Sequence, residues 1–134
     1  MPHIAIPPEL MPGTPGLMRY RQETGRPLSQ LAEVLLRDDH TLSRSERELI
    51  AAYVSALNNC KFCLLTHGEV SAQQHAEGRP LIDKVLADPY SAPISPKLKA
   101  LLRIAEAVQD NGHAVTAAMV ADAKDAGASD LEIH

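Results

Sequence analysis

Both cysteines of the 134-residue chain lie in one short segment, Cys60-Lys61-Phe62-Cys63, and His67 follows four residues later. On an α-helix, side chains three, four and seven positions apart project from the same face, so the two thiols and the imidazole can meet. A helix N-terminus and a nearby proton carrier both favour the thiolate form of a cysteine. The segment therefore predicts a helix that begins near Cys60 and carries two reactive thiols.

Such a dithiol can reduce a peroxide. A thiolate that attacks a peroxide oxygen becomes a sulfenic acid, and a neighbouring thiol condenses with it to give a disulfide and water. Residues three apart on a helix have Cα atoms roughly 5 Å apart, which suits a disulfide. Proton transfer needs a base such as His67, and Glu48 is the candidate carboxylate beside it. On one straight helix Glu48 would lie ~18 Å from Cys60, so its role requires the chain to turn at Asn58-Asn59.

Four other interpretations of these residues stay open. Two cysteines on a helix can serve as small buried hydrophobic residues. The same four side chains, Cys60, Cys63, His67 and Glu48, also have the ligand types of a zinc site, although structural zinc sites more often combine two such cysteine pairs. Glu48 alone can be a solvated helix carboxylate that pairs with a nearby arginine. A non-enzymatic helical interaction protein would tolerate the loss of both cysteines.

Composition and periodicity favour an all-α fold. Aromatic residues make up only 3% of the chain, with no Trp and one Phe, so the core must consist of aliphatic side chains typical of packed helices. Five prolines and two glycines in residues 1–16 predict an extended, proline-rich N-terminal arm. Residues 17–134 are expected to form a single all-helical domain. Apolar periodicity and capping residues predict helices at about 28–37, 43–57, 60–75, 80–86, 95–110 and 116–126, with a last one beginning at Ser129. Ser43 and Glu46 form the predicted capping box of the helix over 43–57.

The charge balance and hydropathy limit the partners. A net charge of −4 provides no basic surface for nucleic acid. No apolar run approaches the ~20 residues that span a bilayer, and the N-terminus lacks the pattern of a signal peptide, so we expect a cytoplasmic protein with no membrane partner. We also expect no cofactor. In a reducing compartment, a lone Cys-x-x-Cys pair is more often catalytic or metal-binding than structural.

Glu48 and the segment from Asn58 to His67 together resemble the signature of the alkylhydroperoxidase D and carboxymuconolactone decarboxylase family. Within that family the chain is most similar to the peroxidase-related branch. It shares with that branch the proline-rich arm, the Arg-x-Glu-Thr-Gly segment at 21–25 and the Ala-Pro-Ile-Ser-Pro-Lys connection at 92–97. The resemblance covers nearly the whole chain.

The resemblance implies a compact multi-helix bundle of the alkylhydroperoxidase D-like type, assembled into trimers or hexamers. It implies reduction of organic hydroperoxides, with Cys63 as the attacking thiol, Cys60 as the resolving thiol, His67 and Glu48 as a proton relay, and an unknown dithiol as reductant. Well-known members carry a further relay histidine where this chain has Phe62. Members also continue beyond the segment that matches 132–134, so we expect a final C-terminal helix to be missing here. The decarboxylase side of the family, a lyase alternative, usually lacks the cysteine pair.

Overall fold

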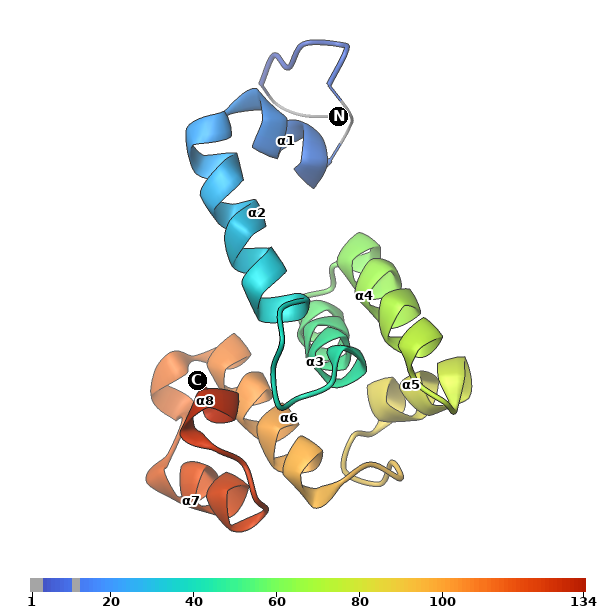
Figure 1. Ribbon diagram of the computed structural model, residues 1–134, viewed down its shortest axis with the longest axis vertical. Helices are drawn as coiled ribbons and strands as arrows, with labels where there is room; N and C mark the ends of the chain where they lie inside the picture. The colour runs from blue at the N-terminus through green and yellow to red at the C-terminus, as the bar shows by residue number, and fades with distance from the viewer. Residues whose placement is uncertain (1–3, 11–12) are drawn as a thin grey trace. The chain divides into compact units, whose positions relative to one another are not determined.

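A computed structural model describes residues 4–10 and 13–134 of the chain. Within these residues it contains eight α-helices and one 3-10 turn and no strand, so the all-α class predicted from the sequence is confirmed (Figure 1). The chain divides into two compact units, one ending at Asp39 and the other beginning at His40. The predicted division, an arm followed by one domain over 17–134, stays a prediction.

The first unit contains two helices, α1 (Thr14–Tyr20) and α2 (Gln22–Leu36). The predicted extended arm over residues 1–16 is wrong at its end, because α1 already begins at Thr14; residues 1–3 and 11–12 lie outside the described residues. Pro15 lies in the first turn of α1, where its fixed φ suits a helix and its missing N–H is not needed. Before α1, the N–H of Leu10 donates to the carbonyl of Pro7 in a turn.

The second helix begins earlier than predicted. It was predicted over about 28–37, after Pro27, but α2 starts at Gln22, so Pro27 lies inside it. An interior proline costs one helical hydrogen bond. Gln22 accepts a hydrogen bond from the Arg26 guanidinium, which supports the turn before the proline. Gly25 explains how α1 and α2 meet, since a Cβ at this position would lie 2.0 Å from the carbonyl oxygen of Met18.

The second unit holds the remaining helices, and most of its predicted boundaries are confirmed. They are α3 (Arg44–Leu57), α4 (Lys61–Gln74), α5 (Gly78–Ala87), α6 (Pro96–Asp110), the 3-10 turn η1 (Gly112–Ala114), α7 (Ala117–Asp125) and α8 (Asp130–Ile133). Serine or threonine side chains cap α3, α6, α7 and α8 where the sequence predicts them. The exception is α5, which begins at Gly78 rather than Pro80, because the proline fits within its first turn.

Two groups of buried side chains form the core of this unit. The first joins α3, α4, α5 and the start of α6 around Leu49, Ile82 and Leu102, each at most 1% exposed. The second joins α6, α7 and the segment after it around Leu42 and Ala123. Ile50 on α3 packs against both groups. Helix α3 is therefore held on both sides, and α4 lies along it (Figure 1).

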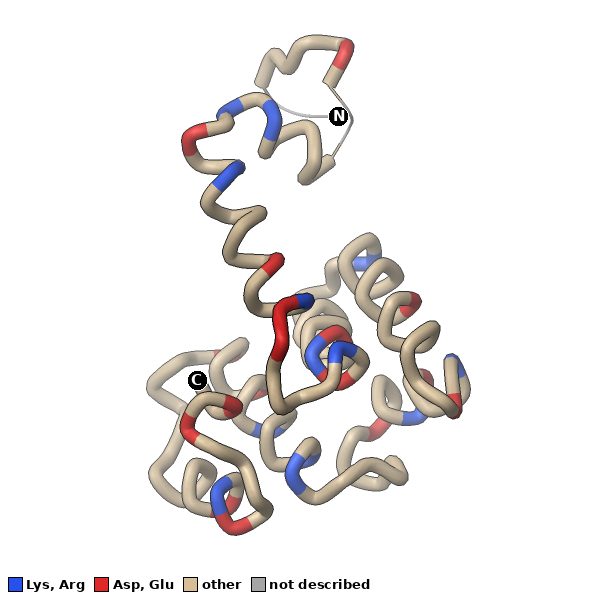
Figure 2. Tube along the Cα trace, in the orientation of Figure 1, with Lys and Arg blue, Asp and Glu red and all other residues tan. Residues whose placement is uncertain are grey.

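Charged residues are distributed along the helices of both units, with acidic and basic positions interspersed (Figure 2). No helix among the described residues has the length and apolar character that a bilayer crossing requires.

Candidate functional site

The candidate site lies on the helical hairpin formed by α3 and α4. A capping box fixes the start of α3: the Ser43 hydroxyl accepts from the Glu46 N–H, and the Glu46 carboxylate accepts from the Ser43 N–H. The predicted turn at Asn58-Asn59 is present. Asn59 has a φ of 54°, a left-handed conformation that asparagine tolerates better than most residues. The chain therefore reverses there and α4 returns beside α3.

The two cysteines occupy the beginning of α4 and form a disulfide. Their Cα atoms are 5.4 Å apart. Cys60 is the N-cap residue, and its sulfur accepts a hydrogen bond from the Cys63 N–H at 3.4 Å. Both residues are partly exposed. The helix start thus presents a pair of sulfurs that are close enough to bond and that solvent can reach.

A carboxylate and an imidazole pair across the hairpin behind the cysteines. Oε2 of Glu48 on α3 lies 2.7 Å from Nδ1 of His67 on α4. The Glu48 side chain is only 4% exposed and that of His67 is 28% exposed. A buried carboxylate requires such a partner. When Nδ1–H donates to Glu48, the neutral imidazole carries a free lone pair on Nε2, which can accept a proton.

The structure thus brings all four predicted site residues onto one hairpin: Cys60 bonded to Cys63, and His67 bonded to Glu48. Their catalytic roles stay predictions. Across the described part of the chain, no three His, Cys, Asp or Glu side chains converge to hold a metal ion, so the zinc alternative gains no support.

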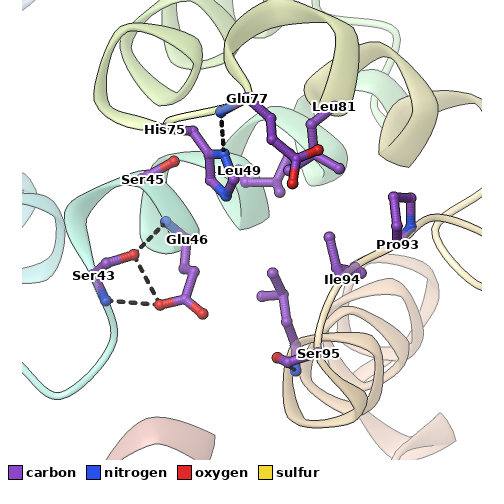
Figure 3. A pocket seen from close by; sticks show the side chains of 11 residues that line it. Ser43, Ser45, Glu46, Leu49, His75, Glu77, Leu81, Pro93, Ile94 and Ser95 are labelled. Carbon is purple, nitrogen blue, oxygen red and sulfur yellow. Dashed lines mark hydrogen bonds between the residues drawn. The ribbon is translucent and has the colours of Figure 1, made fainter.

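A cavity of about 360 Å³ lies in the second unit, between α3, the start of α5 and the start of α6 (Figure 3). The residues that line it include the apolar side chains of Leu49 and Leu81, and the polar side chains of His75, Glu46 and Glu77. His75 accepts a hydrogen bond from the Glu77 N–H through Nδ1. None of the four site residues lines this cavity. Since His75 follows the last residue of α4, the cavity is at the opposite end of that helix from the cysteines.

Sequence reasoning missed two features of the hairpin. His75 was not singled out from the sequence, although it is partly buried at the cavity. Ser45 and Ser71 were not singled out, although both are buried between α3 and α4. Their spacing in the sequence could have identified them, because Ser45 lies one turn before Glu48 and Ser71 lies one turn after His67.

The model of the carboxymuconolactone decarboxylase family matches residues 22–107, which include the whole hairpin. The chain belongs to the carboxymuconolactone decarboxylase family. This membership confirms the family predicted from Glu48 and the Cys60 to His67 segment. No curated protein matches the chain.

Two solved structures share the fold of this family member. One is described as an alkylhydroperoxidase AhpD core, an uncharacterized peroxidase-related protein from Ralstonia eutropha. It has a TM-score of 0.77 and 26% identity over 87% of the chain. The other is an uncharacterized peroxidase-related protein from Silicibacter sp., with a TM-score of 0.78 and 22% identity over 88% of the chain. The chain spans 63% of the length of each. The AhpD-like bundle predicted from the sequence is thus confirmed.

Proposed function

We propose that this protein is a thiol peroxidase that reduces organic hydroperoxides through Cys60 and Cys63, with His67 and Glu48 as the proton relay. The observation that carries the proposal is the Glu48–His67 hydrogen bond on the same hairpin as the Cys60–Cys63 disulfide. A structural disulfide would not need a buried acid-base pair on the same hairpin, whereas thiol oxidation by a peroxide needs both a thiolate and a proton donor. The similarity to an AhpD core structure supports the same reaction class.

In the proposed reaction the Cys63 thiolate attacks the terminal oxygen of the hydroperoxide. The O–O bond breaks, the sulfur becomes a sulfenic acid, and the alkoxide leaves as an alcohol after it gains a proton. The Cys60 thiol then attacks the Cys63 sulfenic acid, and a disulfide and one water form. The disulfide between the two residues is the oxidised end state of this cycle.

His67 lies one turn after Cys63 on α4, and it moves the protons in this proposal. Nε2 accepts the Cys63 proton and returns it to the leaving alkoxide, while Nδ1 stays hydrogen-bonded to Glu48. The carboxylate fixes the tautomer and stabilises the imidazolium that forms, as the carboxylate of a catalytic triad does. Glu48 thereby acts on the thiol through His67.

The cycle closes when a dithiol reduces the disulfide. The incoming dithiol gives two electrons and two protons, becomes a disulfide itself, and restores both cysteines. The proposal leaves the reductant as a dithiol of unknown identity, and it places the protein in the reducing environment of the cytoplasm.

A lyase that acts on a small lactone acid is the second candidate, and the family to which the chain belongs is the observation that favours it. Such a reaction changes no oxidation state, so it would consume no thiols. The two candidates therefore differ in a quantity that is simple to measure.

The test follows thiols and peroxide together. The reduced wild-type protein should lose two thiols per chain for each cumene hydroperoxide consumed, and a dithiol should restore them. Cys60→Ser should lose one thiol and leave a sulfenic acid on Cys63 that dimedone labels. Cys63→Ser should consume no peroxide at a measurable rate. Ser29→Cys in the Cys60→Ser/Cys63→Ser background provides a matched free thiol on the other unit. Wild-type thiols that survive peroxide, or a site that works equally well without cysteines, would contradict the proposal.

A further inference from the structure

Two serines connect α3 and α4 deep in the hairpin. Ser45 is 4% exposed and Ser71 is fully buried. The Ser45 hydroxyl donates to the Ser71 carbonyl oxygen at 2.9 Å, and the Ser71 hydroxyl donates to the Ser45 carbonyl oxygen at 2.8 Å. The two hydroxyl oxygens are 3.2 Å apart. Each hydroxyl has one proton, so these two reciprocal donations use both of them. We call this pair the serine clamp.

One of the two bonds satisfies a group that the helix itself leaves open. Ser71 lies in the last four residues of α4, where the regular helical donors run out, and the His75 N–H donates to the Ala72 carbonyl instead of to that of Ser71. The Ser45 hydroxyl supplies that donor from the neighbouring helix. The clamp thus ties the end of α4 to the first turn of α3, and its loss would leave a buried carbonyl oxygen unpaired.

The serine clamp lies one turn from the acid-base pair. Ser45 is three residues before Glu48, and Ser71 is four residues after His67, so each serine shares a helix face with the neighbouring member of that pair. Because the helices run in opposite directions, the clamp and the Glu48–His67 bond are successive connections between the same two faces. We propose that Ser45 and Ser71 are positioning residues, which hold α3 and α4 in the register that the Glu48–His67 bond requires.

The chemistry of serine explains why this pair suits the task. A hydroxyl one bond from Cβ reaches the carbonyl of another helix only when the two backbones are close. A longer polar side chain could follow a sliding helix, whereas serine loses its bond. The Glu48–His67 bond is 2.7 Å long, and hydrogen bonds weaken steeply once their geometry departs from the ideal. A shift of about 1 Å between reacting groups can greatly lower the rate of the catalysed reaction.

This inference rests on the proposed function for its activity readout, but two further readouts test it independently. Ser45→Ala, Ser71→Ala and the double variant are compared with the wild type in the reduced state. Peroxide turnover should fall roughly tenfold in these variants. This fall is smaller than the ~hundredfold loss of rate expected when an acid-base group is removed altogether. The pH midpoint of cysteine alkylation should rise, and the ¹⁵N signal of His67 Nδ1 should change from a single protonated species to a tautomer mixture.

Ser95→Ala is the matched control. It removes a serine hydroxyl that caps α6 through the Leu98 N–H at 3.1 Å, so it lowers stability without loosening the α3–α4 contact. It should leave turnover, alkylation midpoint and the His67 signal unchanged. If the double serine variant does not fold, each single variant retains one of the two donations and gives the same comparison with a smaller effect.

Coupling to Glu48 decides between positioning and general stability. In a Glu48→Gln background, Ser71→Ala should cause no further change in alkylation, because the link on which it acts is already gone. Additive effects in that background, or an unchanged His67 signal in the folded double serine variant, would overturn the proposal. A wild-type protein that reduces no peroxide would instead refute the proposed function, while the alkylation and ¹⁵N measurements would still decide the role of the serine clamp.

Discussion

Nδ1 of His67 and Oε2 of Glu48 lie 2.7 Å apart, although nineteen residues of chain separate them. The bond joins α3 to α4, so it contributes to the packing of the hairpin as well as to the proton chemistry of His67. The Glu48 carboxylate is buried and makes this bond to an imidazole that solvent can partly reach. A proton that arrives at Nε2 is therefore stabilised by a charge that cannot move away.

Glu48→Gln should slow peroxide reduction by roughly a hundredfold, the usual scale of a lost acid-base group, and should leave the helical content unchanged. The amide cannot stabilise the imidazolium, so less thiolate forms and iodoacetamide should react more slowly at neutral pH. Stopped-flow peroxide consumption and alkylation rates measure both effects. Glu69→Gln is the control, because Glu69 is an exposed carboxylate on α4 that accepts a hydrogen bond from the Gln73 amide. Wild-type rates in a folded Glu48→Gln protein would remove Glu48 from the mechanism.

Asn59→Ala should destabilise the protein by about 1 kcal/mol, because alanine tolerates the left-handed backbone poorly. Asn59→Gly should be close to neutral, since glycine adopts this conformation without a Cβ clash. Urea unfolding of the two variants gives the difference directly. Equal destabilisation by alanine and glycine would indicate that the asparagine side chain, and not the backbone conformation, is what matters at this turn.

Glu132 should make the second unit sensitive to acid. The Glu132 carboxylate accepts three hydrogen bonds, from the Lys97 ammonium, the Ser129 N–H and the Thr41 hydroxyl. The Lys97 and Ser129 bonds contribute most, and together the three lower the pKa of the carboxyl to about 2. Because the folded pKa is depressed, the stabilisation is present above the ordinary glutamate value of about 4.5 and is lost as the pH falls toward 2. Glu132→Gln should therefore lower the melting temperature by several degrees at pH 7. Melting curves from pH 7 to pH 2 should converge; a constant gap would exclude this linkage.

The first unit should mediate association between chains. Helix α2 carries four apolar side chains that are more than half exposed, namely Leu28, Leu31, Val34 and Leu35. Exposed apolar stripes of this kind are typical of contact surfaces. We predict a trimer or hexamer in solution, weakened by Leu31→Glu/Leu35→Glu and unaffected by Gln30→Glu on the same helix. Sedimentation at micromolar concentration tests this; a monomeric wild type would contradict it.

The sequence was sufficient for the hairpin because its signals are local. The Ser43 and Glu46 capping box, the asparagine pair and the cysteine spacing each act within a few residues, and all three appear as predicted. The start of α2 could not be predicted in the same way. Pro27 is a strong local signal for a helix start, but the turn that precedes it and the close contact of Gly25 with Met18 outweigh that signal.

The reactive residues of the site could be predicted from the sequence, but the residues that hold them in position could not. Chemistry identified the cysteines, His67 and Glu48, because their side chains are reactive. Ser45 and Ser71 have ordinary side chains, and only the axial register of α3 against α4 reveals that they meet. The cavity beside His75 depends on the placement of three helices, and no spacing within one segment encodes such a placement.

The left-handed turn at Asn59 also bears on the order in which the protein folds. The Glu48–His67 and Ser45–Ser71 contacts span nineteen and twenty-six residues, so a short loop closure is enough to form both. Contacts with small sequence separation form early, while the ion pair between Lys97 and Glu132, thirty-five residues apart, closes a longer loop. The reactive centre should thus assemble on a nascent hairpin during synthesis, before α6, α7 and α8 have emerged to cover the second half of the core.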